Sequence, residues 1–141
     1  MKILIVEDDI MIADLLEDSL RSFGYDVCGI ASHVAEAASL IQKHRPQMVI
    51  LDMHLDGELG SDIVESLPRA DLVNLGVLYV TGLVEHVLRD DHAGHAVLSK
   101  PYGLATLITA IDAVMTIVEG GTVNQPLPYG LQLLNHAPSR T

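Results

Sequence analysis

Short apolar runs recur along the chain, and segments with apolar positions at helical spacing separate them. The runs cover residues 2–6, 26–31, 48–51, 77–80 and 96–98. Apolar runs without polar alternation are typical of strands that are covered on both faces. We therefore predict five strands buried within one sheet.

Between these runs, apolar side chains recur three or four residues apart, which predicts amphipathic helices. The pattern over 104–118 is the longest, and the pattern that begins at Ile12 ends at Gly24, a residue type that favours the position after a helix. Asp9 and Ser32 stand where a side chain would cap the helix that follows. Shorter helices are expected over 34–41, 63–67 and 83–91.

Strands that alternate with helices form parallel sheets with right-handed crossovers. We predict an α/β fold, namely a flavodoxin-like, doubly wound, five-stranded parallel sheet of order 2-1-3-4-5 with helices on both faces. This domain is expected to span residues 1–120. Residues 121–141 carry three prolines and several leucines. They are expected to form a C-terminal extension that packs on the domain or, alternatively, on a partner.

The chain has 141 residues and a formal net charge of −11, with eight lysines and arginines. Direct nucleic-acid binding needs a basic surface, so this charge argues against it. No apolar stretch reaches the roughly 18 residues of a membrane span, and acids follow the short N-terminal apolar run where a signal peptide would need a cleavage site. We expect a cytoplasmic protein with no membrane partner. The single cysteine, Cys28, excludes an internal disulfide and is expected to be a buried, inert thiol.

Polar side chains stand where four of the predicted strands end. Glu7 and Asp8 follow the first strand, Asp52 the third, Thr81 the fourth and Lys100 the fifth. Strands one and three are neighbours at the switch point of this sheet, so the three carboxylates would share one crevice.

Carboxylates in one crevice repel one another, and a divalent cation with oxygen ligands relieves that repulsion. We predict that Glu7, Asp8 and Asp52 bind Mg²⁺ or Mn²⁺. Asp52 is the candidate phosphoryl acceptor, because aspartate forms acyl phosphates in known enzymes. The Lys100 ammonium and the Thr81 hydroxyl would stabilise the transferring group.

Five segments resemble, in order and spacing, the receiver domain of two-component response regulators. The resemblance covers about residues 2–119, and the five segments in register are far more specific than any one alone. The matching segments are Ile3-Leu4-Ile5-Val6-Glu7-Asp8-Asp9, Ile50-Leu51-Asp52-Met53, Gly60, Tyr79-Val80-Thr81-Gly82 and Ser99-Lys100-Pro101-Tyr102.

This resemblance implies a bacterial phosphorelay in which a histidine kinase, a histidine phosphotransfer protein or a small phospho-donor phosphorylates Asp52. Asp8 would bind Mg²⁺ directly, Glu7 largely through water, and the backbone carbonyl of His54 would be a further ligand. Phosphorylation would switch binding to a downstream protein target, and a homodimer is a further partner to consider. The domain would be a signalling phosphoacceptor and not an enzyme.

The sequence departs from the family pattern at residues associated with switching. Val97 stands where many receivers carry an aromatic switch residue, Gly82 replaces the commoner alanine, and Asp56 stands where many have proline. These features are similar to a stand-alone subset of receivers with a Phe-Ala-Thr-Gly-like fourth strand. No output domain is expected after the last helix.

Other side chains near the predicted site have alternative interpretations. The resemblance assigns His54 and Leu83 to tuning of phosphoryl loss, although a solvated loop histidine is an equal alternative for His54. Tyr79 and Tyr102 are expected to pack in the core, with a switch role as the alternative. A zinc site is disfavoured because its ligands would have to point inward from a polar segment. The histidines in question are His86, His92 and His95.

Two other functions remain open. An interaction domain that works without phosphorylation would keep the fold, and Val97 favours it. A phosphatase or hydrolase that used the same acids would carry a second aspartate two positions after the nucleophile. His54 stands there, so the sequence disfavours this function.

Overall fold

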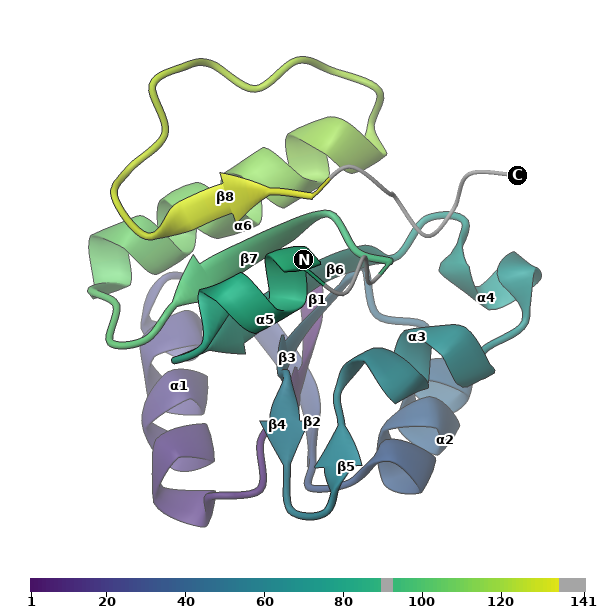
Figure 1. Cartoon of the computed structure of the whole chain (residues 1–141). Coiled ribbons are helices and arrows are strands. Elements are labelled where there is room, and N and C mark those ends of the chain that lie inside the picture. Colours follow the sequence, from purple (N-terminus) through teal and green to yellow (C-terminus); the bar gives the residue numbers. More distant parts are fainter. Residues whose placement is uncertain (90–92, 135–141) are drawn as a thin grey trace.

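The structure is a computed structural model that describes residues 1–89 and 93–134. Within these ranges, six strands form the main sheet in the order β2-β1-β3-β6-β7-β8, and helices cover both of its faces (Figure 1). The first five strands in this order are parallel, so the predicted flavodoxin-like sheet is confirmed. The strands of this sheet are β1 (Lys2–Val6), β2 (Asp26–Ala31), β3 (Met48–Asp52), β6 (Gly76–Thr81), β7 (Ala96–Ser99) and β8 (Leu131–Leu133).

The helices divide between two apolar cores, one on each face of the sheet. Buried side chains of α1 and α6 pack on one face, and buried side chains of α2, α3, α4 and α5 pack on the other. None of the helices in the described ranges is both long enough and apolar enough to cross a membrane. The helices are α1 (Ile10–Ser22), α2 (Val34–His44), α3 (Ser61–Ser66), α4 (Arg69–Leu72), α5 (Val84–Arg89) and α6 (Leu104–Val118).

The helix starts follow local capping rules, with one correction. The Asp9 carboxylate caps α1 by accepting backbone N–H groups of its first turn, as predicted. The prediction that Ser32 caps α2 was wrong. His33 is the cap, and its Nδ1 accepts the Glu36 N–H at 3.3 Å. The Glu36 carboxylate in turn accepts the Ser32 N–H at 2.8 Å, so it bonds to the residue before the cap and not, as in a capping box, to the cap itself. Ser32 therefore precedes the cap.

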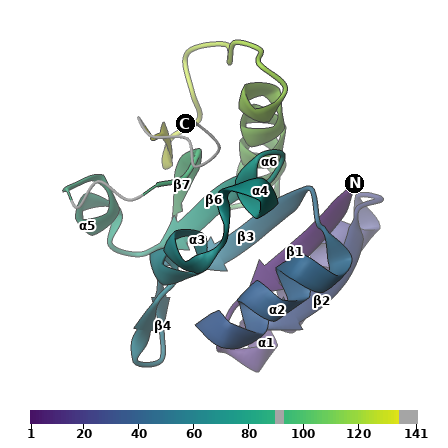
Figure 2. The ribbon, with the colours of Figure 1, turned by 90° about the vertical axis from the view of Figure 1, so that its right-hand side faces the viewer.

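The loop after Asp52 contains a small hairpin that the apolar pattern did not predict. It consists of β4 (His54–Leu55) and β5 (Glu58–Leu59), which are antiparallel, and Gly57 turns between them with a φ of +75°. Such a φ favours glycine. The hairpin projects beyond the carboxyl ends of the parallel strands (Figure 2).

The described part of the C-terminal extension packs on its own domain. Its strand β8 pairs antiparallel with β7, and Leu131 is buried between the extension and the core. The Ser99 N–H donates to the Gly130 carbonyl at 2.8 Å, next to the end of β7. The extension thereby covers the edge of β7 that would otherwise be open. Residues 135–141 lie outside the described residues.

Cys28 lies on β2 and is half-buried. Burial raises the pKa of its thiol above the usual value, so the unreactive protonated form predominates at neutral pH. Cys28 is therefore less buried than predicted, and its low reactivity stays a prediction.

Candidate functional site

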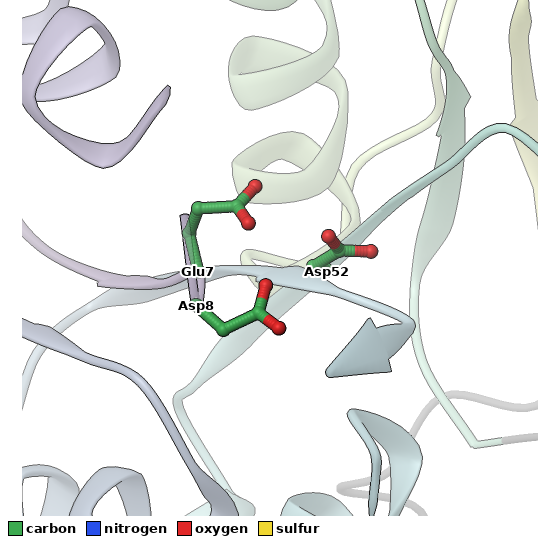
Figure 3. Close-up of side chains that lie close together, drawn as sticks. All are labelled: Glu7, Asp8 and Asp52. Carbon is green, nitrogen blue, oxygen red and sulfur yellow. The ribbon is translucent and has the colours of Figure 1, made fainter. Parts of the chain in front are cut away.

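Three carboxylates meet where β1 and β3 end side by side. Val6 and Leu51 are paired in the sheet, so the residues that follow them on each strand arrive at one place. One carboxylate oxygen from each of Glu7, Asp8 and Asp52 lies within 4.8 Å of the others, and Figure 3 shows the three side chains close together. These residues form the one group of three or more potential metal ligands within the described ranges.

Lys100 reaches this cluster from the end of β7. Its Nζ donates to Asp52 Oδ2 at 2.9 Å and to Glu7 Oε1 at 3.4 Å. Its backbone N–H donates to the Thr81 carbonyl at 2.8 Å, which continues the ladder between β6 and β7 by one residue. The sheet therefore holds the Lys100 ammonium beside the Asp52 carboxylate.

Burial and neighbouring charges shift the pKa values of Glu7 and Lys100 in this site. Burial raises the pKa of the Glu7 carboxyl; the hydrogen bond from the Asp9 N–H and the Lys100 charge oppose this, and the Asp52 charge adds to it. Burial alone would lower the pKa of Lys100, but its hydrogen bond to Asp52 and the nearby negative charges raise it above the usual value. One permanent positive charge thus faces three carboxylates.

The donor set fits a hard divalent cation. Mg²⁺ prefers oxygen ligands and keeps several waters, and here Glu7 is buried, Asp52 is partly buried and Asp8 is exposed. The exposed side can therefore accommodate water or a phosphoryl oxygen. The His54 N–H donates to Asp52 Oδ1 at 3.1 Å, so His54 adjoins the cluster, and the role of its carbonyl as a ligand stays a prediction.

Thr81 lies at the end of β6 beside the cluster and is 1% exposed. Its Oγ1 accepts the Leu83 N–H at 3.0 Å and lies 3.4 Å from His54 Nδ1. Gly82 and Leu83 follow on the exposed rim, and a Cβ built on Gly82 would meet no described atom within 4 Å. A larger side chain than glycine would therefore cause no steric clash of its Cβ with the described atoms at position 82.

The residues at the other predicted switch positions are packed in the core. Val97 is fully buried among side chains on the α2 and α3 face, whereas Tyr102 packs partly buried against the α1 and α6 core. The hydroxyl of buried Tyr79 donates to the Ala93 carbonyl. Tyr79 and Tyr102 therefore both pack against core side chains, as predicted.

The histidines considered for zinc do not form a described cluster. His95 is buried, and its Nδ1 accepts the Val77 N–H at 3.0 Å, which is a structural role within the sheet. His92 and the side chain of His86 lie outside the described residues.

Gly60 has a structural reason that the sequence did not reveal. A Cβ at this position would lie 2.2 Å from the backbone oxygen of Asp52, a distance that side chains do not adopt. The Gly60 N–H also donates to the Met53 carbonyl at 2.7 Å. Glycine therefore allows the returning hairpin to approach the backbone of Asp52. The sequence signals for Gly60 were its place in a loop and its match to the family pattern.

Comparison with known proteins agrees with this geometry. Residues 3–112 match the family described as the response regulator receiver domain. The transcriptional regulatory protein PdtaR of Mycobacterium tuberculosis is 31% identical over 116 residues, which cover 82% of this chain and 57% of PdtaR. The phosphate regulon transcriptional regulatory protein PhoB of Pseudomonas aeruginosa is 27% identical over 142 residues, covering 94% of this chain and 59% of PhoB. The chain thus spans less than two thirds of either relative.

Solved structures have the same arrangement of elements. The response regulator REC domain of PhyR from Erythrobacter litoralis has a TM-score of 0.72 and 30% identity, covering 87% of this chain and 95% of that domain. The response regulator PhyR of Brucella abortus has a TM-score of 0.73 and 28% identity, covering 84% of this chain and 49% of that one. By its sequence match, its relatives and its fold, this chain belongs to the response regulator receiver domain family.

Proposed function

We propose that this chain is the phosphoacceptor module of a bacterial two-component phosphorelay. Asp52 would accept a phosphoryl group from the phosphohistidine of a histidine kinase or a histidine phosphotransfer protein, and the modified domain would bind a downstream protein differently. The observation that carries the proposal is the contact of Lys100 with Asp52 at 2.9 Å inside a cluster of three carboxylates.

The transfer follows from the positions of the side chains. A carboxylate oxygen of Asp52 attacks the phosphorus in line, the phosphorus–nitrogen bond of the donor breaks, and the imidazole keeps the electron pair. Lys100 binds Asp52, and Thr81 follows Val80, the residue paired with Asp52 in the sheet; the Lys100 ammonium and the Thr81 hydroxyl would stabilise the phosphoryl oxygens. Bound by Glu7, Asp8 and Asp52, Mg²⁺ would supply further positive charge for those oxygens.

Apolar side chains beside the site suit a protein donor. Ile10 and Met11 are each 76% exposed and Leu15 is 68% exposed, although all three are apolar residues of α1. Of these three, Leu15 lines a groove of about 680 Å³ between α1 and the segment from Lys100 to Leu107. Large exposed apolar patches mark interaction sites. This supports docking of an apolar donor surface that brings its histidine to Asp52.

The test is phosphorylation in solution with acetyl phosphate and Mg²⁺, followed by intact mass measurement. Wild type should gain one phosphoryl group, Asp52→Asn should gain none, and the exposed α3 variant Asp62→Asn should behave as wild type. An unmodified wild type, or equal modification of Asp52→Asn, would contradict the proposal.

A second function is favoured by one observation. Val97 is fully buried and aliphatic where the family resemblance implies an aromatic switch, so a domain that binds its partner without phosphorylation is the alternative. Under this alternative, beryllofluoride would bind at Asp52 and leave partner affinity unchanged.

A further inference from the structure

The Thr81 hydroxyl connects the buried end of β6 with the exposed hairpin. Its oxygen accepts the Leu83 N–H at 3.0 Å, so its hydrogen is available to His54 Nδ1 at 3.4 Å when the imidazole carries its proton on Nε2. Thr81 is 1% exposed, whereas His54 is exposed on β4. This contact therefore joins an interior residue of the site to a surface element.

His54 has a second link to the acceptor. Its backbone N–H donates to Asp52 Oδ1 at 3.1 Å, on the carboxylate whose other oxygen binds Lys100. A change of charge and bonding at Asp52 therefore acts on His54 through its backbone and, by way of Thr81, through its side chain. His54 thus contacts the side chains of both Asp52 and Thr81.

The hairpin that carries His54 is tied to a helix on the same face of the sheet. The Glu58 carboxylate on β5 accepts the Val34 N–H at the start of α2, at 2.9 Å. Gly60 closes the base of the hairpin on Met53. Movement of β4 would therefore change the surface formed by the hairpin and the first turn of α2.

Transmission of phosphorylation through Val97 on β7 is less favourable than transmission through the hairpin. Val97 has no polar atom that could exchange partners, is fully buried, and has neighbouring strands on both sides, with Tyr79 on β6 and Gln132 on β8 as its pair residues. Close-packed interiors resist displacement of single side chains. In the hairpin, Leu55 is buried, but His54 and residues 56 and 57 are exposed, so less of this element is close-packed than at Val97.

We propose that phosphorylation is transmitted through His54 to the β4–β5 hairpin and the start of α2. The Thr81 hydroxyl leaves His54 Nδ1 and binds a phosphoryl oxygen, and the hairpin rearranges as His54 loses this partner. His54 is then a positioning residue that holds Thr81 away from the acceptor before phosphorylation. This inference rests on the proposed phosphoacceptor function.

The test compares amide NMR spectra with and without beryllofluoride and Mg²⁺. Outside the residues of the site, wild type should show its largest shift changes at 55–59 and 34–36, and smaller ones at 84–88 and 96–98. His54→Ala should still bind beryllofluoride. Its amide shift changes at 55–59 and 34–36 should fall by about half or more, because the contact with Thr81 that differs between the two states is gone. His54→Asn, whose amide oxygen can stand near the Nδ1 position, should restore much of the response.

The outcomes distinguish failure of the phosphoacceptor function from failure of the transmission through His54. If wild type shows no beryllofluoride binding at Asp52, the phosphoacceptor function itself is wrong. If wild type binds it and the hairpin response is equally large in His54→Ala, or is concentrated at 84–98, the function stands and the transmission through His54 is overturned. Circular dichroism of each variant verifies that it is folded.

Discussion

Two sides of the site follow the receiver family to different degrees. On the β1 and β3 side, Glu7, Asp8 and Asp52 converge as the family resemblance implies. On the β6 and β7 side, Val97 replaces the aromatic residue and β8 covers the edge of β7. Accepting a phosphoryl group needs only fixed charges at strand ends, whereas transmission needs an element with two arrangements. The proposed phosphoacceptor chemistry is therefore compatible with a changed route of transmission.

The strongest test of the acceptor side is Lys100→Ala. This change removes the cation that binds Asp52 and Glu7, and in enzymes the loss of one group that stabilises developing charge lowers rates by roughly 10²–10³-fold. We expect phosphorylation by acetyl phosphate to slow by about 10²-fold, measured by intact mass over time. The exposed α2 variant Lys43→Ala is the matched control and should keep the wild-type rate. Equal rates for both variants would remove Lys100 from the mechanism.

The contribution of the extension is tested by Leu131→Ala. Leu131 is 3% exposed where β8 packs on the core, and truncation of a buried leucine costs about 2–5 kcal/mol of unfolding free energy. On a short edge strand we expect about 2 kcal/mol, measured by urea denaturation. Tyr129→Ala, at a fully exposed position on the same extension, should change stability by less than about 0.5 kcal/mol. If Leu131→Ala were equally neutral, β8 would not stabilise the β7 side.

The hairpin joins the two sides, and Gly60→Ala tests its approach to Asp52. The added Cβ would stand 2.2 Å from the Asp52 backbone oxygen, so the backbone must move away from the acceptor. Misplacement of a reacting group lowers rates steeply, and we expect phosphorylation to slow about tenfold. Gly82→Ala, where an added Cβ has open space among the described atoms, should retain the wild-type rate. A slow Gly82→Ala variant with a normal Gly60→Ala variant would reverse the assignment.

The smallest effect concerns the charge of Glu7. Since burial raises its pKa, the folded state holds the Glu7 proton more tightly than the unfolded state does. The resulting stabilisation is full below the ordinary carboxyl pKa and is lost as the pH rises through the raised value. Without Mg²⁺, Glu7→Gln should therefore raise Tm at neutral pH by about 2–4 °C, and the gain should vanish at low pH.

Two controls complete that experiment. Glu85→Gln, on the exposed surface of α5, should leave the pH dependence of Tm as in wild type. Added Mg²⁺ should raise the Tm of wild type more than that of Glu7→Gln, because a ligand that binds the folded state stabilises it. A lower Tm for Glu7→Gln at neutral pH would show that the Glu7 charge is stabilising.

Long apolar patterns made most of the fold predictable. The predicted bounds of β1, β2 and α6 agree with the structure. The buried strand β1 has an unbroken apolar run and α6 has apolar residues along its length, whereas β2 is an edge strand in which only Val27 and Ala31 are buried. The two-residue strands of the hairpin and the three-residue β8 are too short for such a pattern. The cap of α2 was misplaced by one residue, since Ser32 and His33 both offer an acceptor and the loop geometry decides between them.

The sequence by itself determined the alternation of strands and helices and the polar residues at the strand ends, because periodicity and strand-end chemistry are local properties. Only the tertiary structure decided which groups meet. Lys100 binds Glu7 from 93 residues away, and Thr81 contacts His54 across 27 residues. These contacts depend on strand register, on the turn at Gly57 and on the close approach that Gly60 permits. The physical reason is that a pattern specifies which face of an element is buried, whereas a hydrogen bond requires ångström positions that the packed sheet sets.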